Sequence, residues 1–185
     1  MKNRLWAEQW LGSPIGKCQV IIILIIIGVL GRWVPHIPNM TPVLSLSLFA
    51  GSHLGRRMAL TSILIILFIS DVGLSLWLDY PVFGYWTLFT YSGFAIIVLV
   101  GSNLKNSLQS FPIYIFGSSL YFWFWTNMGV WLTGNLYPKT LTGLITCYTV
   151  ALPFLHNSLI GDTIWGTAIF GAFGLIMSHS KKTVA

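Results

Sequence analysis

The sequence predicts an all-α integral membrane protein. Of its 185 residues, 55% are hydrophobic and only 8% are charged, whereas an ordinary soluble domain carries roughly 25% charged residues. The apolar residues fall into seven stretches, separated by short polar or proline-rich segments. Since each crossing needs roughly 20 apolar residues, we predict a single transmembrane domain over residues 1–185. This composition excludes a cytosolic enzyme and a nucleic-acid-binding module.

The first three apolar stretches are predicted to be helices of a membrane bundle. Residues 18–30 follow a polar, basic segment and lack a small-residue cleavage site after them, so we predict a retained helix rather than a signal peptide. Three prolines within 34–42 remove backbone donors and predict a rigid loop. A short helix is expected over 43–54, and a longer one over 58–78, which contains Asp71.

Four further apolar stretches follow along the chain. Residues 79–85 combine turn formers with aromatic side chains that suit a membrane interface. Helices are expected over 86–100 and 112–132, and the second carries a dense aromatic run. After a polar break, we expect a shorter apolar stretch over 140–154, ended by a proline and a polar trio. The last helix is predicted over 159–177.

The basic residues predict six crossings with both ends of the chain in the cytoplasm. If Lys17 lies inside, Arg56 and Arg57 also fall inside, as the positive-inside rule requires. A spanning 140–154 would carry the C-terminal lysines outside, so we predict a partial helix on the outer side, and seven crossings stay open. The net charge of +6 is then topology rather than nucleic-acid binding, because all ten bases lie at segment ends: Lys2, Arg4, Lys17, Arg32, Arg56, Arg57, Lys105, Lys139, Lys181 and Lys182.

Three polar groups lie where hydrocarbon should exclude them, and they predict a substrate-binding site. Asp71 and Asn127 are expected about two turns from the outer ends of their helices, and Asp162 in the first turn of the last helix. A carboxylate at this depth is costly unless it faces a polar cavity or a partner. We therefore predict a common pocket that opens outward. The structural alternative is that Asp162 caps its helix and Asp71 bonds to a neighbouring helix.

Further candidates flank the same face. His36 lies in the proline-rich loop and His156 just before the predicted last helix. Either imidazole could bond a ligand or coordinate a metal, although each could also be a plain polar anchor at the interface. Asn39, Tyr85 and Tyr91 would add hydrogen-bonding groups and a stacking surface.

No enzymatic activity and no cofactor are expected. The sequence contains no P-loop, GxGxxG, GxSxG or HExxH motif. Leu159-Ile160-Gly161-Asp162 weakly matches the GxGD signature of intramembrane aspartyl proteases, whose two carboxyls must share a proton. Leu159 stands where the first glycine is required, so this remains a minor alternative. Cys18 and Cys147 have no metal-like spacing and are expected to be small buried hydrophobes.

The sequence contains several distinctive motifs: Arg32-Trp33-Val34-Pro35-His36-Ile37-Pro38-Asn39-Met40-Thr41-Pro42, Leu48-Phe49-Ala50-Gly51, Ser70-Asp71, Thr126-Asn127-Met128-Gly129-Val130-Trp131, Tyr137-Pro138-Lys139-Thr140, and Pro153-Phe154 through Asn157 to Gly161-Asp162. With these motifs the chain resembles a family of uncharacterised bacterial inner-membrane proteins. That family is similar to the S components of energy-coupling-factor vitamin transporters, and in particular to the solitary cobalamin transporters of the BtuM type.

The resemblance implies a six-helix S-component-like bundle in the bacterial inner membrane, with cytoplasmic termini. It implies uptake of a vitamin or cofactor precursor, such as cobalamin or a related corrinoid, held between the outer loops and the outer helix ends. By motif, His36, Asn39, Asp71 and the aromatics near Tyr85 carry over as pocket residues, and His36 is a candidate ligand of a corrinoid cobalt.

Two departures from that family limit the expectation. Residues 79–86 lack the cysteine with which cobalamin-type members ligate cobalt, and the first helix lacks the AxxxA patch with which many S components dock on a coupling subunit. An energising coupling module is therefore left open as a partner, beside the lipid bilayer and the vitamin-like substrate. The alternative is a non-transporting membrane protein with a structural or assembly role.

Overall fold

The computed structural model describes residues 13–79, 81–104 and 110–179, with side chains to residue 176. Within these ranges the chain forms seven α-helices and no strand. Three of them, α2, α4 and α8, are long and apolar enough to cross a membrane. The helices are α2 (Pro14–Trp33), α3 (Val43–His53), α4 (Arg56–Leu78), α5 (Tyr85–Gly101), α6 (Phe111–Thr133), α7 (Leu141–Val150) and α8 (Leu152–His179).

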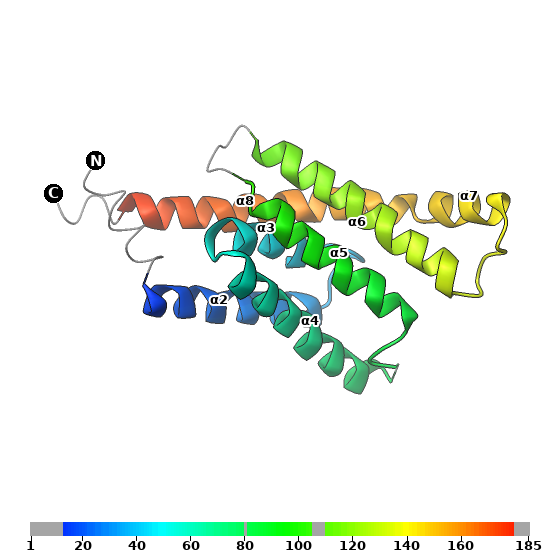
Figure 1. Cartoon of the computed structure of the whole chain (residues 1–185), viewed down its shortest axis with the longest axis horizontal. Coiled ribbons are helices and arrows are strands. Elements are labelled where there is room, and N and C mark those ends of the chain that lie inside the picture. Colours follow the sequence, from blue (N-terminus) through cyan, green and yellow to red (C-terminus); the bar gives the residue numbers. More distant parts are fainter. Residues whose placement is uncertain (1–12, 80, 105–109, 180–185) are drawn as a thin grey trace.

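Helices α2, α7 and α8 run along one long axis and α4, α5 and α6 cross it obliquely, which gives the molecule two ends (Figure 1). We call the end at which α2 begins and α8 ends the basic end, because Lys17, Arg56 and Arg57 lie toward it. The opposite end is the loop end, where the segment 134–140 lies; the segment 34–42 lies nearer the middle of the long axis, beside α8. This arrangement places the start of α2 and the end of α8 on the same side.

The short helix α3 lies at the centre of the bundle. Residues 42–51 are all buried, and α2, α4, α5, α6 and α8 pack around α3. Its 11 residues extend only about 16 Å, which is roughly half of the hydrocarbon thickness of a bilayer. The surroundings of α3 are therefore protein over residues 43–51, and its last two residues are half-buried.

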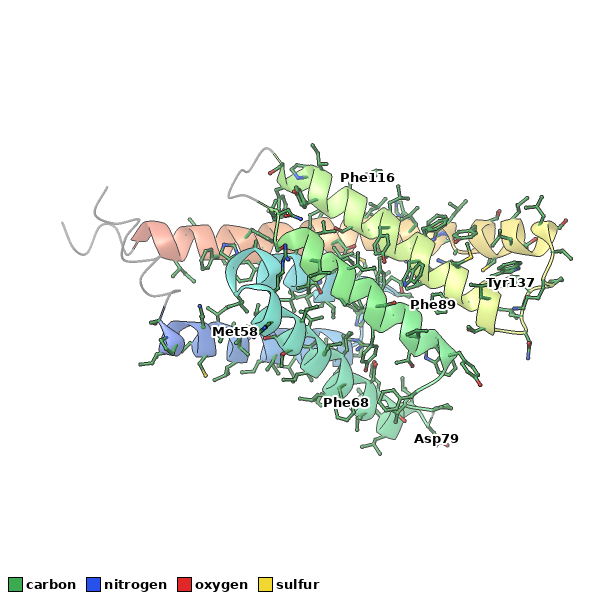
Figure 2. All side chains as sticks on the ribbon, in the orientation of Figure 1. Met58, Phe68, Asp79, Phe89, Phe116 and Tyr137 are labelled. Carbon is green, nitrogen blue, oxygen red and sulfur yellow. The ribbon has the colours of Figure 1, made fainter. Side chains whose placement is uncertain are left out.

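The bundle surrounds α3 with an apolar outer surface. Ile23 on α2, Phe68 on α4, Phe116 on α6 and Ile164 on α8 are each more than half exposed, and Figure 2 shows Phe68 and Phe116 pointing away from the bundle. Soluble monomers rarely expose contiguous apolar surface on this scale. Hydrocarbon is the solvent that suits these side chains.

Glycines allow α3 and α5 to cross with their backbones in contact. A Cβ atom on Gly51 would lie 2.1 Å from the carbonyl oxygen of Val98, and one on Gly101 would lie 2.6 Å from the carbonyl oxygen of Leu48. No real Cβ atom fits at such distances from backbone. The two glycines thus fix how closely the central helix packs, as small residues do in membrane bundles.

The loop over 34–42 is confirmed as non-helical, and it packs over the start of α3. Trp165 of α8 donates its indole N–H to the carbonyl of Met40 at 3.2 Å. Gly161 lies so close to Met40 that a Cβ atom on the glycine would be 2.8 Å from the Met40 Cα. The loop is therefore held by α8 as well as by its own prolines.

The prediction for residues 140–177 is wrong at one point. The polar residues His156, Asn157 and Ser158 lie inside α8, which begins at Leu152 rather than at residue 159. Pro153 does not end a helix but lies in the first turn of α8, where a missing N–H leaves no bond unmade. Backbone bonds continue across Ala151, so α7 and α8 form a nearly continuous rod (Figure 1).

Candidate functional site

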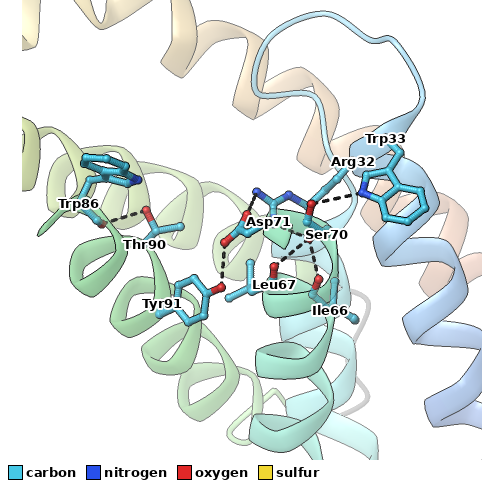
Figure 3. A network of polar contacts seen from close by, with 9 residues as sticks. All are labelled: Arg32, Trp33, Ile66, Leu67, Ser70, Asp71, Trp86, Thr90 and Tyr91. Carbon is cyan, nitrogen blue, oxygen red and sulfur yellow. Dashed lines mark hydrogen bonds and ion pairs between the residues drawn. The ribbon is translucent and has the colours of Figure 1, made fainter. Parts of the chain in front are cut away.

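A charged cluster joins α2, α4 and α5 (Figure 3). Nη2 of Arg32 lies 2.6 Å from Oδ1 of Asp71, and the Tyr91 hydroxyl donates to Oδ2 of the same carboxylate at 2.8 Å. Arg32 also donates through Nη1 to Ser70 Oγ at 2.6 Å, and the Trp33 indole donates to the Ser70 carbonyl at 3.2 Å. Every oxygen of the Asp71 carboxylate therefore has a partner from another helix.

Helix geometry places this Arg32–Asp71–Tyr91 cluster toward the loop end. Arg32 is the penultimate residue of α2, Asp71 lies two turns before the end of α4, and Tyr91 lies two turns after the start of α5. The side chains of Arg32 and Asp71 are 18% and 14% exposed, so the pair is neither sealed nor fully solvated. An acid among apolar helices needs such a partner.

The sequence pointed to Asp71 and Tyr91 but missed Arg32. Asp71 and Tyr91 were both predicted site residues, and the structure brings them into contact. Arg32 was assigned to topology because it ends an apolar stretch. Its place at the end of α2 opposite to Lys17 was the available signal, since a base on that side runs against the positive-inside pattern.

Lys139 is a second base at the loop end with partners of its own. Its ammonium donates to the carbonyls of Trp131 and Gly134 at the end of α6. It also lies 5.8 Å from the centroid of the Trp131 ring. A cation is favourable at a helix C-terminus, where carbonyls lack intrahelical donors. Lys139 thus caps the C-terminus of α6 and holds the segment that connects α6 to α7.

Asp162 belongs to a second cluster, in the interior between α3, α6 and α8. Its side chain is 3% exposed, and Ser119 Oγ lies 2.6 Å from Oδ2. The Ser45 hydroxyl donates to the Asp162 backbone carbonyl at 2.9 Å. The proposed capping role of Asp162 is wrong, because it lies ten residues after Leu152, the first residue of α8.

The structure does not gather the predicted polar residues into one pocket. Among the described residues, no contact joins the carboxyls of Asp71 and Asp162, which have separate partners. The Asn127 amide donates to the Trp123 carbonyl of its own helix at 2.7 Å, and Cys147 Sγ approaches the Asn127 carbonyl at 3.6 Å. Each of the three intramembrane groups is thus held in a different place.

The remaining predicted site residues lie on the surface. His36, Asn39, Tyr85 and His156 are all exposed, and His36 Nδ1 lies 2.6 Å from the Val34 carbonyl oxygen. Asn39 adopts a left-handed backbone with φ of 66°, which asparagine tolerates better than most residues. In the described part of the chain no three His, Cys, Asp or Glu side chains gather around a possible metal ion. Cobalt ligation by His36 alone stays a prediction.

The two cysteines differ. Cys147 is buried, as predicted, but Cys18 is exposed. The buried face of this part of α2 carries Gly16, Val20 and Leu24, so Cys18 lies on the outward face. The residues around Cys18 are apolar because both the buried and the outward face of α2 are apolar. The sequence of such a helix does not show which of its two faces is buried.

An apolar groove of about 220 Å³ lies between α5 and α6. None of the predicted site residues lines it, and its walls are mostly hydrocarbon. Ser118 and Tyr121 add two buried hydroxyls, and neither has a hydrogen-bond partner among the described residues. The lining residues are Ile97, Val100, Ile113, Tyr114, Gly117, Ser118 and Tyr121.

Comparison with known proteins gives one match. The model of a protein family described as a family of unknown function matches residues 14–184, which is nearly the whole chain. None of the curated proteins matches the chain, and neither does any solved structure. The chemistry of the clusters is therefore the evidence on which a function has to rest.

Proposed function

Since the chain belongs to DUF6580, a family of unknown function, its role has to be inferred from its own residues, and we propose that it is an S-component-like membrane transporter. It would bind a vitamin or cofactor precursor, with a corrinoid as the leading candidate. The Arg32–Asp71–Tyr91 cluster is the observation that carries this proposal, because a partly exposed ion pair among apolar helices is costly and points to a functional site.

The cluster offers a ligand both charge and hydrogen bonds. Arg32 presents several N–H donors in a planar fork that suits carboxylate and phosphate groups, and Asp71 and the Tyr91 hydroxyl lie beside it. A ligand with an anionic group would compete with Asp71 for Arg32. The exchange of one anion for another keeps the guanidinium paired, which limits the free energy lost when the internal pair opens.

The two bases at the loop end support the proposed orientation. Arg32 is neutralised by Asp71, and Lys139 is engaged by the carbonyls that end α6. The described bases at the basic end include Arg56 and Arg57, which are exposed. Lys139 is exposed as well, so two exposed bases of the described part lie at the basic end and one at the loop end. We assign the basic end, which has more of them, to the cytoplasm. In this proposal α2, α4, α5, α6 and the α7–α8 rod are five crossings, and the short α3, enclosed by the other helices, makes the sixth passage inside the bundle.

Cysteine labelling tests this orientation. In a variant that carries Cys18→Ser and Cys147→Ser, a single cysteine is placed by Asn135→Cys at the loop end or by Arg57→Cys at the basic end; both positions are exposed. In intact cells, an impermeant maleimide is expected to label the first and to label the second only after lysis. Labelling of Arg57→Cys in intact cells would contradict the orientation.

Ligand binding tests the proposed site. Purified protein in nanodiscs is titrated with cobalamin, cobinamide and a panel of other vitamins, and binding is read from thermal stabilisation and from co-purified absorbance. We expect at least one compound to bind, and Asp71→Asn to weaken its affinity at least tenfold. Asp79→Asn is the matched control, because Asp79 is exposed at the end of α4 and should leave the affinity unchanged.

A second candidate function has an observation in its favour. The cluster is closed, since both Asp71 oxygens and both Arg32 amino groups have partners, as expected of an interhelical clamp in a structural or assembly protein. A double variant separates the two functions. Arg32→Gln with Asp71→Asn removes both charges, so a folded double variant that has lost binding supports the transporter. Wild-type protein that binds no compound supports the clamp.

A further inference from the structure

The Asp162 cluster is unusual for a carboxylate inside a membrane bundle, because no cation balances it. The only ion pair among the described residues joins Arg32 and Asp71. Asp162 is 3% exposed, and the single hydrogen-bond partner of its carboxyl group in the described structure is Ser119. An ionised carboxylate in this environment would be unpaired in a medium of low dielectric constant, where isolated charge is strongly disfavoured.

The helices packed around Asp162 bring hydroxyls rather than charges. Helix α6 carries no Asp, Glu, Lys or Arg, and its titratable residues are Tyr114 and Tyr121. The titratable residue of α3 is His53, whose ring stacks on Phe49 at 4.4 Å, two turns from Ser45. On α8 the described neighbour is His156, which is exposed. None of these groups has a described contact with the Asp162 carboxyl.

The hydrogens of this cluster can be counted. Ser119 has one hydroxyl hydrogen but two neighbouring oxygens, the Ile115 carbonyl at 3.0 Å and Asp162 Oδ2 at 2.6 Å. A carbonyl oxygen can only accept, so one hydroxyl hydrogen cannot satisfy both contacts. A hydrogen on Oδ2 removes the shortage, because Asp162 then donates to Ser119 while Ser119 donates to Ile115.

We propose that Asp162, with Ser119 and Ser45, is a proton-binding site in the membrane interior, and that Asp162 is a neutral carboxylic acid at neutral pH. Ser119 holds the carboxyl group, and Ser45 fixes the α8 backbone at the same residue through its 2.9 Å bond to the Asp162 carbonyl. The three residues come from three helices, so a movement of α6 against α8 would separate the acid from its partner. If the protein is a transporter, this proton would be the ion whose movement is coupled to transport. That role rests on the proposed transport function, whereas the binding of the proton does not.

Infrared spectroscopy of the full chain in nanodiscs tests the site directly. The chain has only four acidic side chains, so the C=O stretching band of a protonated carboxyl group can be assigned by substitution. We expect such a band at neutral pH in the wild-type protein, shifted downward in D2O and lost in Asp162→Asn. Asp79→Asn is the control and should keep the band.

A second variant keeps the inference testable if Asp162→Asn does not fold. Ser119→Ala retains the acid but removes its partner, so the band should persist and move to higher wavenumber. Absence of a protonated carboxyl band in the wild-type protein would overturn the proposal, as would a band that survives Asp162→Asn unchanged. Loss of the band in sodium chloride but not in choline chloride would overturn the assignment of Asp162 as a neutral acid in the presence of sodium, since Na⁺ would then displace the proton. None of these results requires a ligand, so they are independent of the binding experiment.

Discussion

Gly51→Val is expected to destabilise the protein by about 3 kcal/mol, because overpacking of a closed core has costs of this order. The added Cβ atom would lie 2.1 Å from the Val98 carbonyl oxygen, which belongs to the backbone of α5 and cannot rotate away. Relief requires α3 and α5 to separate. Since α3 is buried on all sides, a shift at this crossing disturbs its contacts with the other helices as well.

The measurement is unfolding of purified protein in mixed micelles with increasing dodecyl sulfate, followed by circular dichroism and tryptophan fluorescence. Gly171→Val is the matched control, since a Cβ atom on Gly171 meets nothing within 4 Å. Valine has a slightly higher helix propensity than glycine, so the unfolding midpoint of Gly171→Val should not fall. Equal midpoints for Gly51→Val and the wild-type protein would show that α3 and α5 do not cross as described.

Neutralising only one partner of the charged cluster is the second large effect expected. Asp71→Asn leaves the Arg32 guanidinium without a counter-charge among apolar helices, and Arg32→Gln leaves the Asp71 carboxylate in the same position. Loss of one partner from a fully buried pair costs roughly 3–5 kcal/mol. Because the two side chains are 18% and 14% exposed, we expect about 2–3 kcal/mol for each single variant after allowance for solvent screening.

The double variant should be less destabilised than the sum of the singles, with a coupling energy of about 1–3 kcal/mol. Two amides can replace the ion pair with a hydrogen bond, and the Tyr91 hydroxyl keeps an acceptor on residue 71. The same unfolding assay, applied to the wild-type protein, the two single variants and the double variant, gives the double-mutant cycle. Asp79→Asn serves again as the control because asparagine tolerates the left-handed backbone of that position. Additive single effects would mean that Arg32 and Asp71 do not interact in the membrane.

The class of fold and most helix positions follow from the sequence, because a chain in hydrocarbon must satisfy its backbone hydrogen bonds internally. Helices matching 43–54 and 58–78 appear as α3 and α4, since long apolar runs have few alternatives in a bilayer. The start of α8 did not follow. His156, Asn157 and Ser158 look like a break between helices, but His156 is exposed and the other two are only half-buried, so the helix accepts these polar side chains without a break.

The candidate site was only partly predictable for a different reason. Rarity of charge identifies Asp71 and Asp162 as informative, but it does not say which partner each will find. Arg32 and Ser119 are distant in sequence from the acids they contact, and a serine among apolar residues carries no signal by itself. Their similar predicted depth in the membrane suggested one common pocket for the two acids. In the structure, α3 packs between the helices, and the acids belong to two separate clusters.

The shortness of α3 bears on how the protein is made. A segment of 11 residues is about half the length that crosses a bilayer, so it has little tendency to enter lipid by itself as it leaves the ribosome. Four of the five helices that enclose it, α4, α5, α6 and α8, are synthesised after it. The helix α3 is thus made early but is enclosed only after the later helices have been synthesised. Truncation before α8 would leave the Ser45 side of α3 without its partner.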